Sequence, residues 1–292
     1  MKRRNSWKKD IAAVFILTIV FELMHLMGCP MTLRAEESTE KTIAGLGTSV
    51  IANPQEPKST TDNWQGSYVY FGNYEHNPIK YRVLTGSTTD FGGTTMLLDC
   101  DSILCSSVFD DSIDGTYSNI WKSSSIKSYL NSTFFTSCFS VVEQEAIAPS
   151  TKAGHLLSSD KVTSWTQEAF KEYVALEGEK IFLLDAEDVS NESYGYSKAD
   201  TSAANKVKMN ADGKAAYWWL RSAYSSQDNI AGVVDDVGEI YIFNYVNYDY
   251  VGVAPALNVN LSSVLFSSVI QGTEGEIGAE YKLTLLDKDK AV

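Results

Sequence analysis

Histidine is the side chain best suited to acid–base chemistry near neutral pH, and this chain offers few positions for it. His76 and His155 lie in polar, loop-like segments, while His25 lies in an apolar N-terminal stretch. Neither loop histidine has a nucleophile pattern such as Gly-x-Ser-x-Gly beside it. Because a general base must reach the proton that it removes, the sequence favours surface positions over catalysis for both.

Paired carboxylates could hydrolyse a glycosidic bond if two of them flanked the sugar at the right separation. Glu143 and Glu145 are two positions apart, so on a helix they would point to different faces. Asp185, Glu187 and Asp188 follow an apolar run, where we expect them to begin a turn or cap a short helix. A carboxylate-dependent hydrolase therefore has no site-specific pattern here and stands as an alternative.

Oxygen ligands suited to calcium are most concentrated in the last quarter of the chain. They are Asp228, Asn229, Asp235, Asp236, Asn244, Asn247 and Asp249. The spacing of an EF-hand loop is absent, and Asp and Asn are common turn residues. We predict turns and no cofactor, with calcium as the alternative, and the number of Cys and His ligands disfavours a zinc site.

The segment from Phe243 to Tyr250 alternates Tyr with Asn and Asp, a composition typical of recognition loops. Together with Tyr224–Asn229 it predicts a binding face for a glycan or a surface protein. The predicted ligand-binding residues are Tyr224, Asn229, Asn244, Tyr245, Asn247, Tyr248, Asp249 and Tyr250. The alternative is that these tyrosines decorate a β ribbon, as ordinary strand propensity would allow.

Three residues of the run 217–222 are expected to be structural: Trp218, Trp219 and Arg221. Side chains alternate along a strand, so Trp218 and Leu220 should share one face, while Trp219 and Arg221 share the other. Leu220 indicates that its face is core, and the final hairpins should be apolar on one side and solvated on the other. Arg221 is expected to bind loop carbonyls or a carboxylate through its five donors.

The first 35 residues form a basic segment followed by an apolar run, the pattern of a signal peptide or membrane anchor. Cleavage after Ala35 predicts an extracellular or cell-surface protein. In the alternative, Leu26-Met27-Gly28-Cys29 resembles a lipobox, and Cys29 would carry a lipid anchor. Residues 36–63 read as a polar linker, because they are rich in Glu, Ser, Thr, Lys and Pro without apolar periodicity.

The chain of 292 residues carries 24 basic and 37 acidic residues, a formal charge of −13. Six basic and two acidic residues precede residue 36, so residues 36–292 carry 18 basic and 35 acidic ones. Such an acidic surface repels phosphates, which excludes nucleic acid as the expected partner. Cys100, Cys105 and Cys138 leave two options open: one disulfide with one free thiol, or three reduced thiols.

Hydrophobic patterning predicts a mixed α+β domain over residues 64–262. A β tail, or the start of an incomplete module, follows over residues 263–292. Strands are expected at 68–71, 79–84, 95–100, 181–184, 217–222, 230–234, 239–243, 251–259, 264–270 and 281–286, and helices at 126–134, 141–148 and 166–176. Asp235-Asp236-Val237-Gly238 is expected to form a hairpin turn.

Several ordered motifs resemble a known family. They are Tyr70-Phe71-Gly72-Asn73-Tyr74, Tyr81-Arg82-Val83-Leu84, Trp121, residues 123–131, Phe134-Phe135, Phe139-Ser140, Ile181-Phe182-Leu183-Leu184, residues 217–222 and Gly252-Val253-Ala254-Pro255-Ala256-Leu257. The set resembles the bacterial domain-of-unknown-function family 6273, common in exported proteins, over about residues 64–260. Its closing strands are similar to the C-type-lectin-like fold that formylglycine-generating enzymes share.

This second resemblance implies a C-type-lectin-like domain, in which a few helices pack on twisted antiparallel sheets. The cysteine pair of formylglycine-generating enzymes is missing, since no cysteine lies beyond Cys138. The calcium-dependent sugar motif of lectins is missing too, because the one Glu-Pro pair, Glu56-Pro57, lies in the linker. Because a fold does not determine function, we expect a non-catalytic recognition module, with a hydrolase or a structural module of an adhesin as alternatives.

Overall fold

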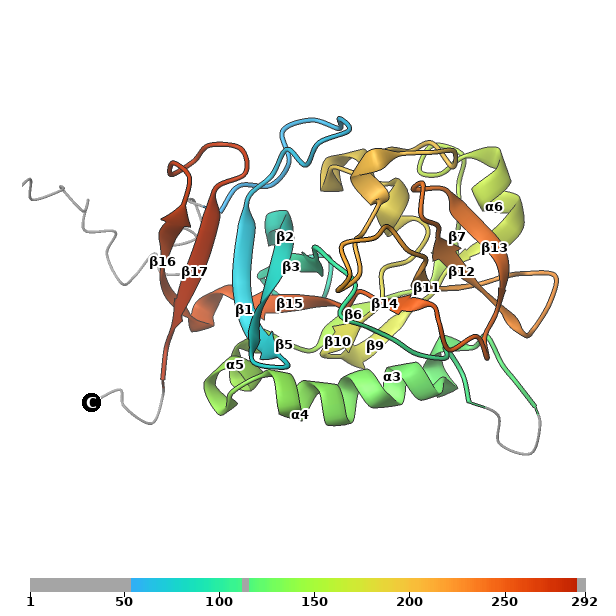
Figure 1. Ribbon diagram of the computed structural model, residues 1–292, viewed down its shortest axis with the longest axis horizontal. Helices are drawn as coiled ribbons and strands as arrows, with labels where there is room; N and C mark the ends of the chain where they lie inside the picture. Colours follow the sequence, from blue (N-terminus) through green and yellow to red (C-terminus); the bar gives the residue numbers. More distant parts are fainter. Residues whose placement is uncertain (1–53, 112–115, 288–292) are drawn as a thin grey trace, which may run out of the picture. The chain divides into compact units, whose positions relative to one another are not determined.

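The computed structural model of the chain describes residues 54–111 and 116–287, which all belong to the unit Lys41–Val292 (Figure 1). The predicted export segment 1–35, with Cys29, and linker residues 36–53 lie outside the described residues. Within the described ranges, no helix is both long enough and apolar enough to cross a membrane.

The largest sheet of the described chain has eight strands and is here called the main sheet. Its order is β10-β15-β3-β2-β1-β17-β16, and β5 pairs with β15. Neighbours run antiparallel, except that β1 and β17 run parallel. The strands are β1 (Tyr68–Tyr74), β2 (Asn77–Thr88), β3 (Thr95–Cys100), β5 (Ile147–Ala148), β10 (Ile181–Phe182), β15 (Ala256–Asn260), β16 (Val264–Gln271) and β17 (Glu280–Leu285).

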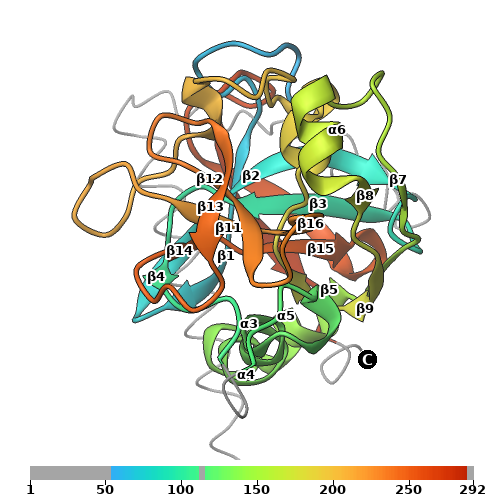
Figure 2. The ribbon, with the colours of Figure 1, turned by 90° about the vertical axis from the view of Figure 1, so that its right-hand side faces the viewer.

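A second sheet of five strands, here called the small sheet, has the order β13-β12-β11-β14-β4 (Figure 2). Its strands are β4 (Cys105–Ser106), β11 (Trp218–Ala223), β12 (Ile230–Val234), β13 (Ile240–Tyr245) and β14 (Gly252–Val253). β11 and β14 run parallel, so neither sheet is purely antiparallel as the sequence predicted. Two-stranded pairs join β6 (Ser150–Lys152) with β9 (Leu176–Glu179) and β7 (His155–Leu156) with β8 (Glu172–Tyr173).

The helices are few and short. α3 (Ser125–Tyr129), the π-helical turn η3 (Leu130–Phe134) and α4 (Phe135–Cys138) form one continuous segment, which runs with α5 (Val141–Ala146) along one side of the main sheet (Figure 1). α6 (Ser164–Phe170) lies apart, near β7. Short 3-10 turns complete the set: η2 (Trp121–Ser123), η4 (Asp188–Ser190), η5 (Glu192–Tyr194), η6 (Ala204–Lys206) and η7 (Leu261–Ser263). A strand-rich α+β class is thus confirmed.

Polar caps begin the two helices that were predicted from residues 126 and 141. Ser124 precedes α3, and its hydroxyl accepts a hydrogen bond from the amide of Lys127. Ser140 and Glu143 form a capping box before α5, in which each side chain binds the backbone amide of the other. The apolar face of the first segment is buried as its spacing predicts, at Ile126, Leu130 and Phe134.

The third predicted helix is shorter than expected. It was predicted over 166–176, but α6 ends at Phe170, and Lys171 turns the chain away with a positive φ of 59°. Phe170, Tyr173 and Leu176 are all buried at a spacing of three, which imitates a helical face. Tyr173 and Leu176 instead lie on β8 and β9, where strand pairing satisfies their backbone.

The small sheet is buried on both sides over β11 and β12, which corrects the prediction of one solvated side. Trp218, Trp219, Leu220 and Arg221 are all inaccessible to solvent. Trp219 faces Phe109, with ring centroids 5.6 Å apart, and its indole donates to the carbonyl of Ser107. The segment that carries β4 therefore covers the face that the sequence assigned to solvent.

The turn between β12 and β13 has the predicted chemistry. The Asp235 carboxylate accepts hydrogen bonds from the amides of Val237 and Glu239, which fixes the turn. Gly238 has a φ of 85°, and a Cβ there would lie 2.1 Å from the carbonyl oxygen of Ala203. Glycine is therefore required at this position by both conformation and space.

Both ends of the described chain join the domain. β17 pairs with β1 and β16 pairs with β17, so the tail extends the main sheet instead of starting another module. At the other end, the backbone of Gln55 pairs with Ser67, which brings part of the predicted linker onto the domain. Cys100, Cys105 and Cys138 are all free thiols, so the reduced alternative holds for these described cysteines.

Arg221 ties the small sheet to the segment that follows β10. Its guanidinium donates to the carbonyls of Val174 and Leu183 and forms an ion pair with Asp188 at 2.9 Å. These are the two kinds of partner expected from the sequence. Both charges are buried, and burial of a charge is tolerated only when it is paired and hydrogen-bonded.

We predict that Arg221→Met lowers the free energy of unfolding by about 3–5 kcal/mol, because the buried Asp188 loses its closest cation and keeps only Lys152, at 3.8 Å. The double variant Arg221→Met with Asp188→Asn should recover part of this loss, since it removes both charges. Lys122→Met, which breaks the exposed ion pair with Glu177, serves as the control and should leave urea unfolding unchanged. A double variant no more stable than Arg221→Met would contradict this account.

Lys206 is a second buried cation, and its ammonium binds the carbonyl oxygen of Ala199. Burial lowers the pKa of Lys206 from 10.5 to about 8, against the opposing charge of Asp200. Between pH 8 and 10.5 the unfolded chain therefore binds more protons at this residue than the folded chain does, and stability rises with pH across that window.

We predict that wild type gains about 2 kcal/mol of unfolding free energy relative to Lys206→Met between about pH 7.5 and 9.5. Urea unfolding of both proteins at the two pH values measures this difference. Other titrating groups are common to the two proteins and cancel in the comparison. Equal pH slopes for the two proteins would show that Lys206 is not desolvated.

Candidate functional site

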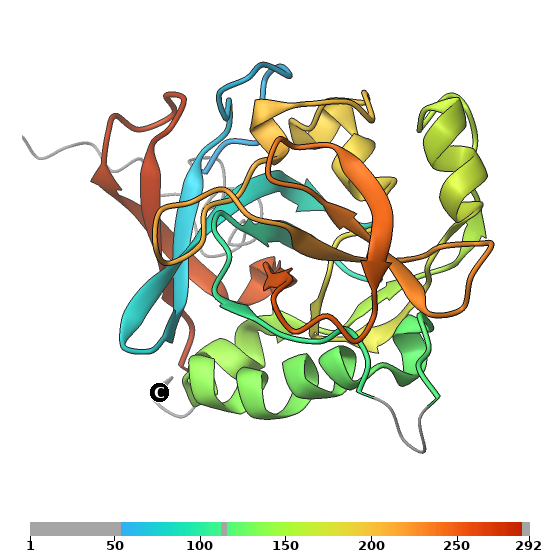
Figure 3. The ribbon, with the colours of Figure 1, turned by 45° about the vertical axis from the view of Figure 1, so that its right-hand side comes forward.

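The outer side of β13 carries aromatic residues. β13 is an edge strand of the small sheet, and Figure 3 shows it with the loop that follows. Side chains alternate along a strand, and the burial of β13 alternates accordingly. Its buried residues are Ile240, Ile242 and Asn244, and its outer residues are Tyr241, Phe243 and Tyr245.

Three further rings extend this outer side into a group of six, here called the aromatic face. Its members are Tyr217, Tyr241, Phe243, Tyr245, Tyr248 and Tyr250. Ring centroids lie 6.3 Å apart for Tyr217 and Tyr241 and 5.0 Å apart for Tyr241 and Phe243. In the loop, the distances are 5.5 Å for Tyr245 and Tyr248 and 5.0 Å for Tyr248 and Tyr250. These contacts preorganise the rings with little loss of side-chain entropy on binding.

Three of these six rings are open to solvent. Phe243 is 64%, Tyr250 60% and Tyr245 41% exposed. Tyr217, Tyr241 and Tyr248 are partly buried and pack against the core. Burial of Tyr245, Tyr248 and Tyr250 in the core would have excluded a binding face, but these three rings are not all buried.

The remaining predicted binding residues divide between the surface and the core. Asn247 and Asp249 are exposed beside the rings. Asn229 is exposed, and its carbonyl accepts from the amide of Val246, so the loop 224–229 lies against the end of β13. Tyr224 is partly buried against the core. Asn244 is a correction: it is 3% exposed on the inner side of β13, because strand alternation turns it away from the tyrosines.

Asn119 is a residue that the sequence analysis missed. Its side-chain amide donates to the carbonyls of Tyr224, Gln227 and Ile230 and so fixes the loop 224–229. It lies 105 positions or more from its partners, and no local pattern marks such a contact.

The charges near the aromatic face are acidic. No Lys or Arg occurs between Arg221 and Lys282 in the sequence. Burial raises the pKa of Tyr217, and the nearby Asp236 and Asp235 raise it further. Burial, Tyr248 and Asp249 likewise raise the pKa of Tyr250. Both phenols therefore stay protonated at neutral pH and can donate hydrogen bonds.

Two of the seven residues considered for calcium are buried and belong to the fold. Asp235 caps the β12–β13 turn, and Asn244 is buried away from the others. Over residues 54–111 and 116–287, no group of three or more His, Cys, Asp and Glu side chains gathers as metal ligands do.

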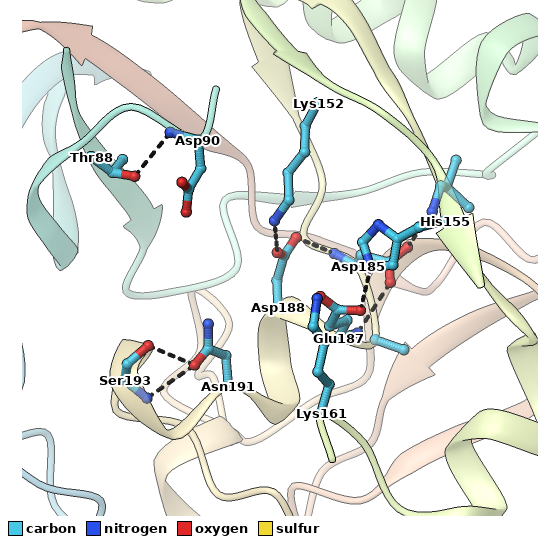
Figure 4. A network of polar contacts seen from close by, with 12 residues as sticks. Thr88, Asp90, Lys152, His155, Lys161, Asp185, Glu187, Asp188, Asn191 and Ser193 are labelled. Atoms are coloured by element: carbon cyan, nitrogen blue, oxygen red, sulfur yellow. Dashed lines mark hydrogen bonds and ion pairs between the residues drawn. The ribbon is translucent and has the colours of Figure 1, made fainter. Parts of the chain in front are cut away.

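A polar cavity of about 620 Å³ forms a second candidate site. It lies among β6, β7, the start of α6 and the turns η4 and η5 (Figure 4). Its lining is mostly charged or polar: Asp90, Lys152, Ala153, His155, Asp160, Lys161, Glu187, Ser190, Asn191, Glu192, Ser193, Tyr194 and Lys198.

Glu187 is the central carboxylate of this cavity, and both of its oxygens are bound. Nε2 of His155 lies 2.8 Å from Oε2, and Lys161 donates to Oε1 at 3.0 Å (Figure 4). The imidazole of His155 stacks on the ring of Tyr173, with centroids 4.9 Å apart. A carboxylate held by two such partners is poorly suited to act as an acid or a nucleophile.

Two further carboxylates lie buried beneath the cavity. Burial raises the pKa of Asp185, although Arg221 opposes it, and its oxygens accept from the amides of Val174 and Glu187. Burial alone would raise the pKa of Asp188, but Arg221 and Lys152 together hold it below the ordinary range. These residues form a turn, as predicted, because Asp188 accepts from the amide of Asp185.

The sequence did not predict that this cavity exists. His155 was expected on the surface, but it meets Glu187 across 32 positions, and Lys161 meets Glu187 across 26. Such contacts depend on how β7 and η4 are placed in the fold, and the hydrophobic periodicity of the sequence does not predict that placement. His76, by contrast, is exposed as expected.

Comparisons with curated proteins and with solved structures find no match. Residues 92–261 match the family described as a domain of unknown function, DUF6273. This match covers more than half of the 292 residues and runs from the loop before β3 to the end of β15. It includes β11, β13 and the loop with the tyrosines. The chain therefore belongs to the DUF6273 family.

Proposed function

We propose that this protein is a non-catalytic recognition module that binds an uncharged glycan on its aromatic face. The observation that carries the proposal is two sets of three contacting rings on β13 and its flanking segments, with three of the six rings more than 40% exposed. Pyranose rings present apolar C–H faces that pack on aromatic rings, while their hydroxyls need donors and acceptors nearby. Protonated tyrosines, Asn247 and Asp249 supply these.

The preference for an uncharged glycan rests on electrostatics. Asp236 and Asp249 are exposed near the rings, and residues 222–281 contain no cation to pair with a ligand anion. A sulfated, phosphorylated or carboxylated sugar would meet these carboxylates and would find no cation among residues 222–281 for a charge-assisted hydrogen bond. A surface protein is the other occupant considered, and its binding would depend on the same residues.

The proposal includes an extracellular location and a lectin-like fold. The basic and apolar N-terminal pattern supports export, and a lectin-like arrangement of the closing strands would fit a ligand face beside them. Binding a glycan outside the cell without chemical conversion requires no cofactor, so we propose no cofactor.

A carboxylate-dependent hydrolase is the second candidate, and the polar cavity is the observation in its favour. Asp185 has the raised pKa that a general acid needs, but backbone amides occupy its oxygens. Glu187 is held by His155 and Lys161. The third candidate, a structural module, loses its support from the tail, because β16 and β17 complete the main sheet.

We predict that the full chain binds at least one of the uncharged oligosaccharides of cellulose, chitin or mannan in titration calorimetry. Tyr250→Ala and Phe243→Ala should each weaken that binding about tenfold, because one stacked ring contributes about 1 kcal/mol or slightly more. Phe266→Ala is the matched control: Phe266 is 53% exposed but lies on β16, and its loss should leave binding unchanged.

Two outcomes would refute the proposal. One is that none of these oligosaccharides binds at millimolar concentration. The other is that binding persists unchanged in Tyr250→Ala and Phe243→Ala. Release of reducing sugar that stops in Glu187→Gln would instead favour the hydrolase.

A further inference from the structure

Asp99 and Lys208 form an ion pair in the core of the domain. Nζ of Lys208 lies 2.6 Å from Oδ2 of Asp99, and both side chains have 0% solvent exposure. Asp99 lies on β3 of the main sheet, and Lys208 lies in the segment between η6 and β11. The two residues are 109 positions apart, so this contact joins distant parts of the chain.

The surroundings of Lys208 disfavour its charged form. Nζ of Lys208 lies 4.3 Å from the ring centroid of Trp218, and the carbonyl of Cys100 is its other acceptor. Burial lowers the pKa of Lys208, and the nearby Arg82 lowers it further, while Asp99 opposes them. Transfer of one proton from the ammonium to the carboxylate would leave an amine and a carboxylic acid, which removes two buried charges.

The two oxygens of Asp99 have different environments. Oδ2 accepts a hydrogen bond from the hydroxyl of Tyr196. Burial raises the pKa of Tyr196 well above its ordinary value, so the phenol keeps its proton. Oδ1 is buried and has no hydrogen-bond partner among the described residues. A donor therefore holds the oxygen that would carry negative charge in a tetrahedral intermediate, while the other oxygen is free to leave.

We propose that Lys208 and Asp99 become joined by an intramolecular amide bond, formed without any enzyme or cofactor. The amine nitrogen of Lys208 attacks the carboxyl carbon of Asp99, and the bond from this carbon to Oδ1 breaks. Of the three hydrogens of the original ammonium, one stays on the amide nitrogen and two leave with Oδ1 as water. No group is oxidised or reduced.

Folding supplies the proximity and the dry surroundings that this reaction lacks in solution. Groups fixed in reacting geometry have effective molarities of about 10⁵–10⁸ M, which offsets the low reactivity of a carboxylic acid towards an amine. The site also excludes bulk water, which would protonate the amine and hydrolyse the product. The bond would link β3 of the main sheet to the chain that enters the small sheet at β11, so the two sheets could not separate on unfolding.

The test is the mass of the purified full chain and a tryptic peptide map. We expect the wild-type chain to be lighter than its unlinked composition by one water molecule. Trypsin should release peptide 83–122, which contains Asp99, joined to peptide 207–214, which contains an uncleaved Lys208. The peptide map does not depend on how the N-terminus is processed.

Variants identify the bond. Lys208→Arg and Asp99→Ala should restore the missing water and abolish the joined peptides. Lys206→Arg is the matched control: Lys206 is equally buried, but its ammonium binds a backbone carbonyl, so its replacement should leave the link intact. Tyr196→Phe should slow formation of the link by about 10²-fold, as removal of one oxyanion donor does.

The wild-type measurement decides the proposal even if a variant fails to fold. A wild-type mass that equals the unlinked composition, with peptides 83–122 and 207–208 recovered separately after complete digestion, would overturn it. A link found between Lys208 and any residue other than Asp99 would overturn it too.

Discussion

The arrangement of this domain depends on one buried ion pair, between Arg221 on β11 and Asp188 on η4. The guanidinium also binds two carbonyls and packs over the ring of Tyr173, with its central carbon 4.5 Å from the ring centroid. A planar group with five donors can connect a strand, a turn and a loop at once, as a lysine could not. The pair gains little net energy after desolvation, but it allows few other arrangements of these segments.

The pair also determines what the polar cavity can do. Asp188 and Asp185 beneath it are committed to Arg221 and to backbone amides, and Glu187 is held by His155 and Lys161. Carboxylates that stabilise a turn are not free to exchange protons with a substrate. The same small sheet presents at its edge the aromatic face, three of whose rings are more than 40% exposed, and the proposed recognition there needs no free carboxylate.

The sequence predicted the elements well where local rules govern them. Caps at Ser124 and Ser140, the Asp235–Gly238 turn and the alternation of β13 all follow from neighbours along the chain. The solvated side of β11 was wrong, because the segment around Ser107 and Phe109 covers it from more than 100 positions away. Sequence patterns do not predict the contact of His155 with Glu187 or the burial of Asp99 and Lys208, because each depends on tertiary packing.

The position of the buried cations explains why the surface near the rings is acidic. Arg82, Lys206 and Arg221 are all less than 10% exposed, each bound to a carboxylate or a carbonyl inside the domain. These side chains cannot offset surface carboxylates for a ligand approaching from solvent, since an interior charge is already paired. Because these cations are buried and residues 222–281 contain no Lys or Arg, the net charge of the sequence understates how strongly the region from β12 to β16 repels anions.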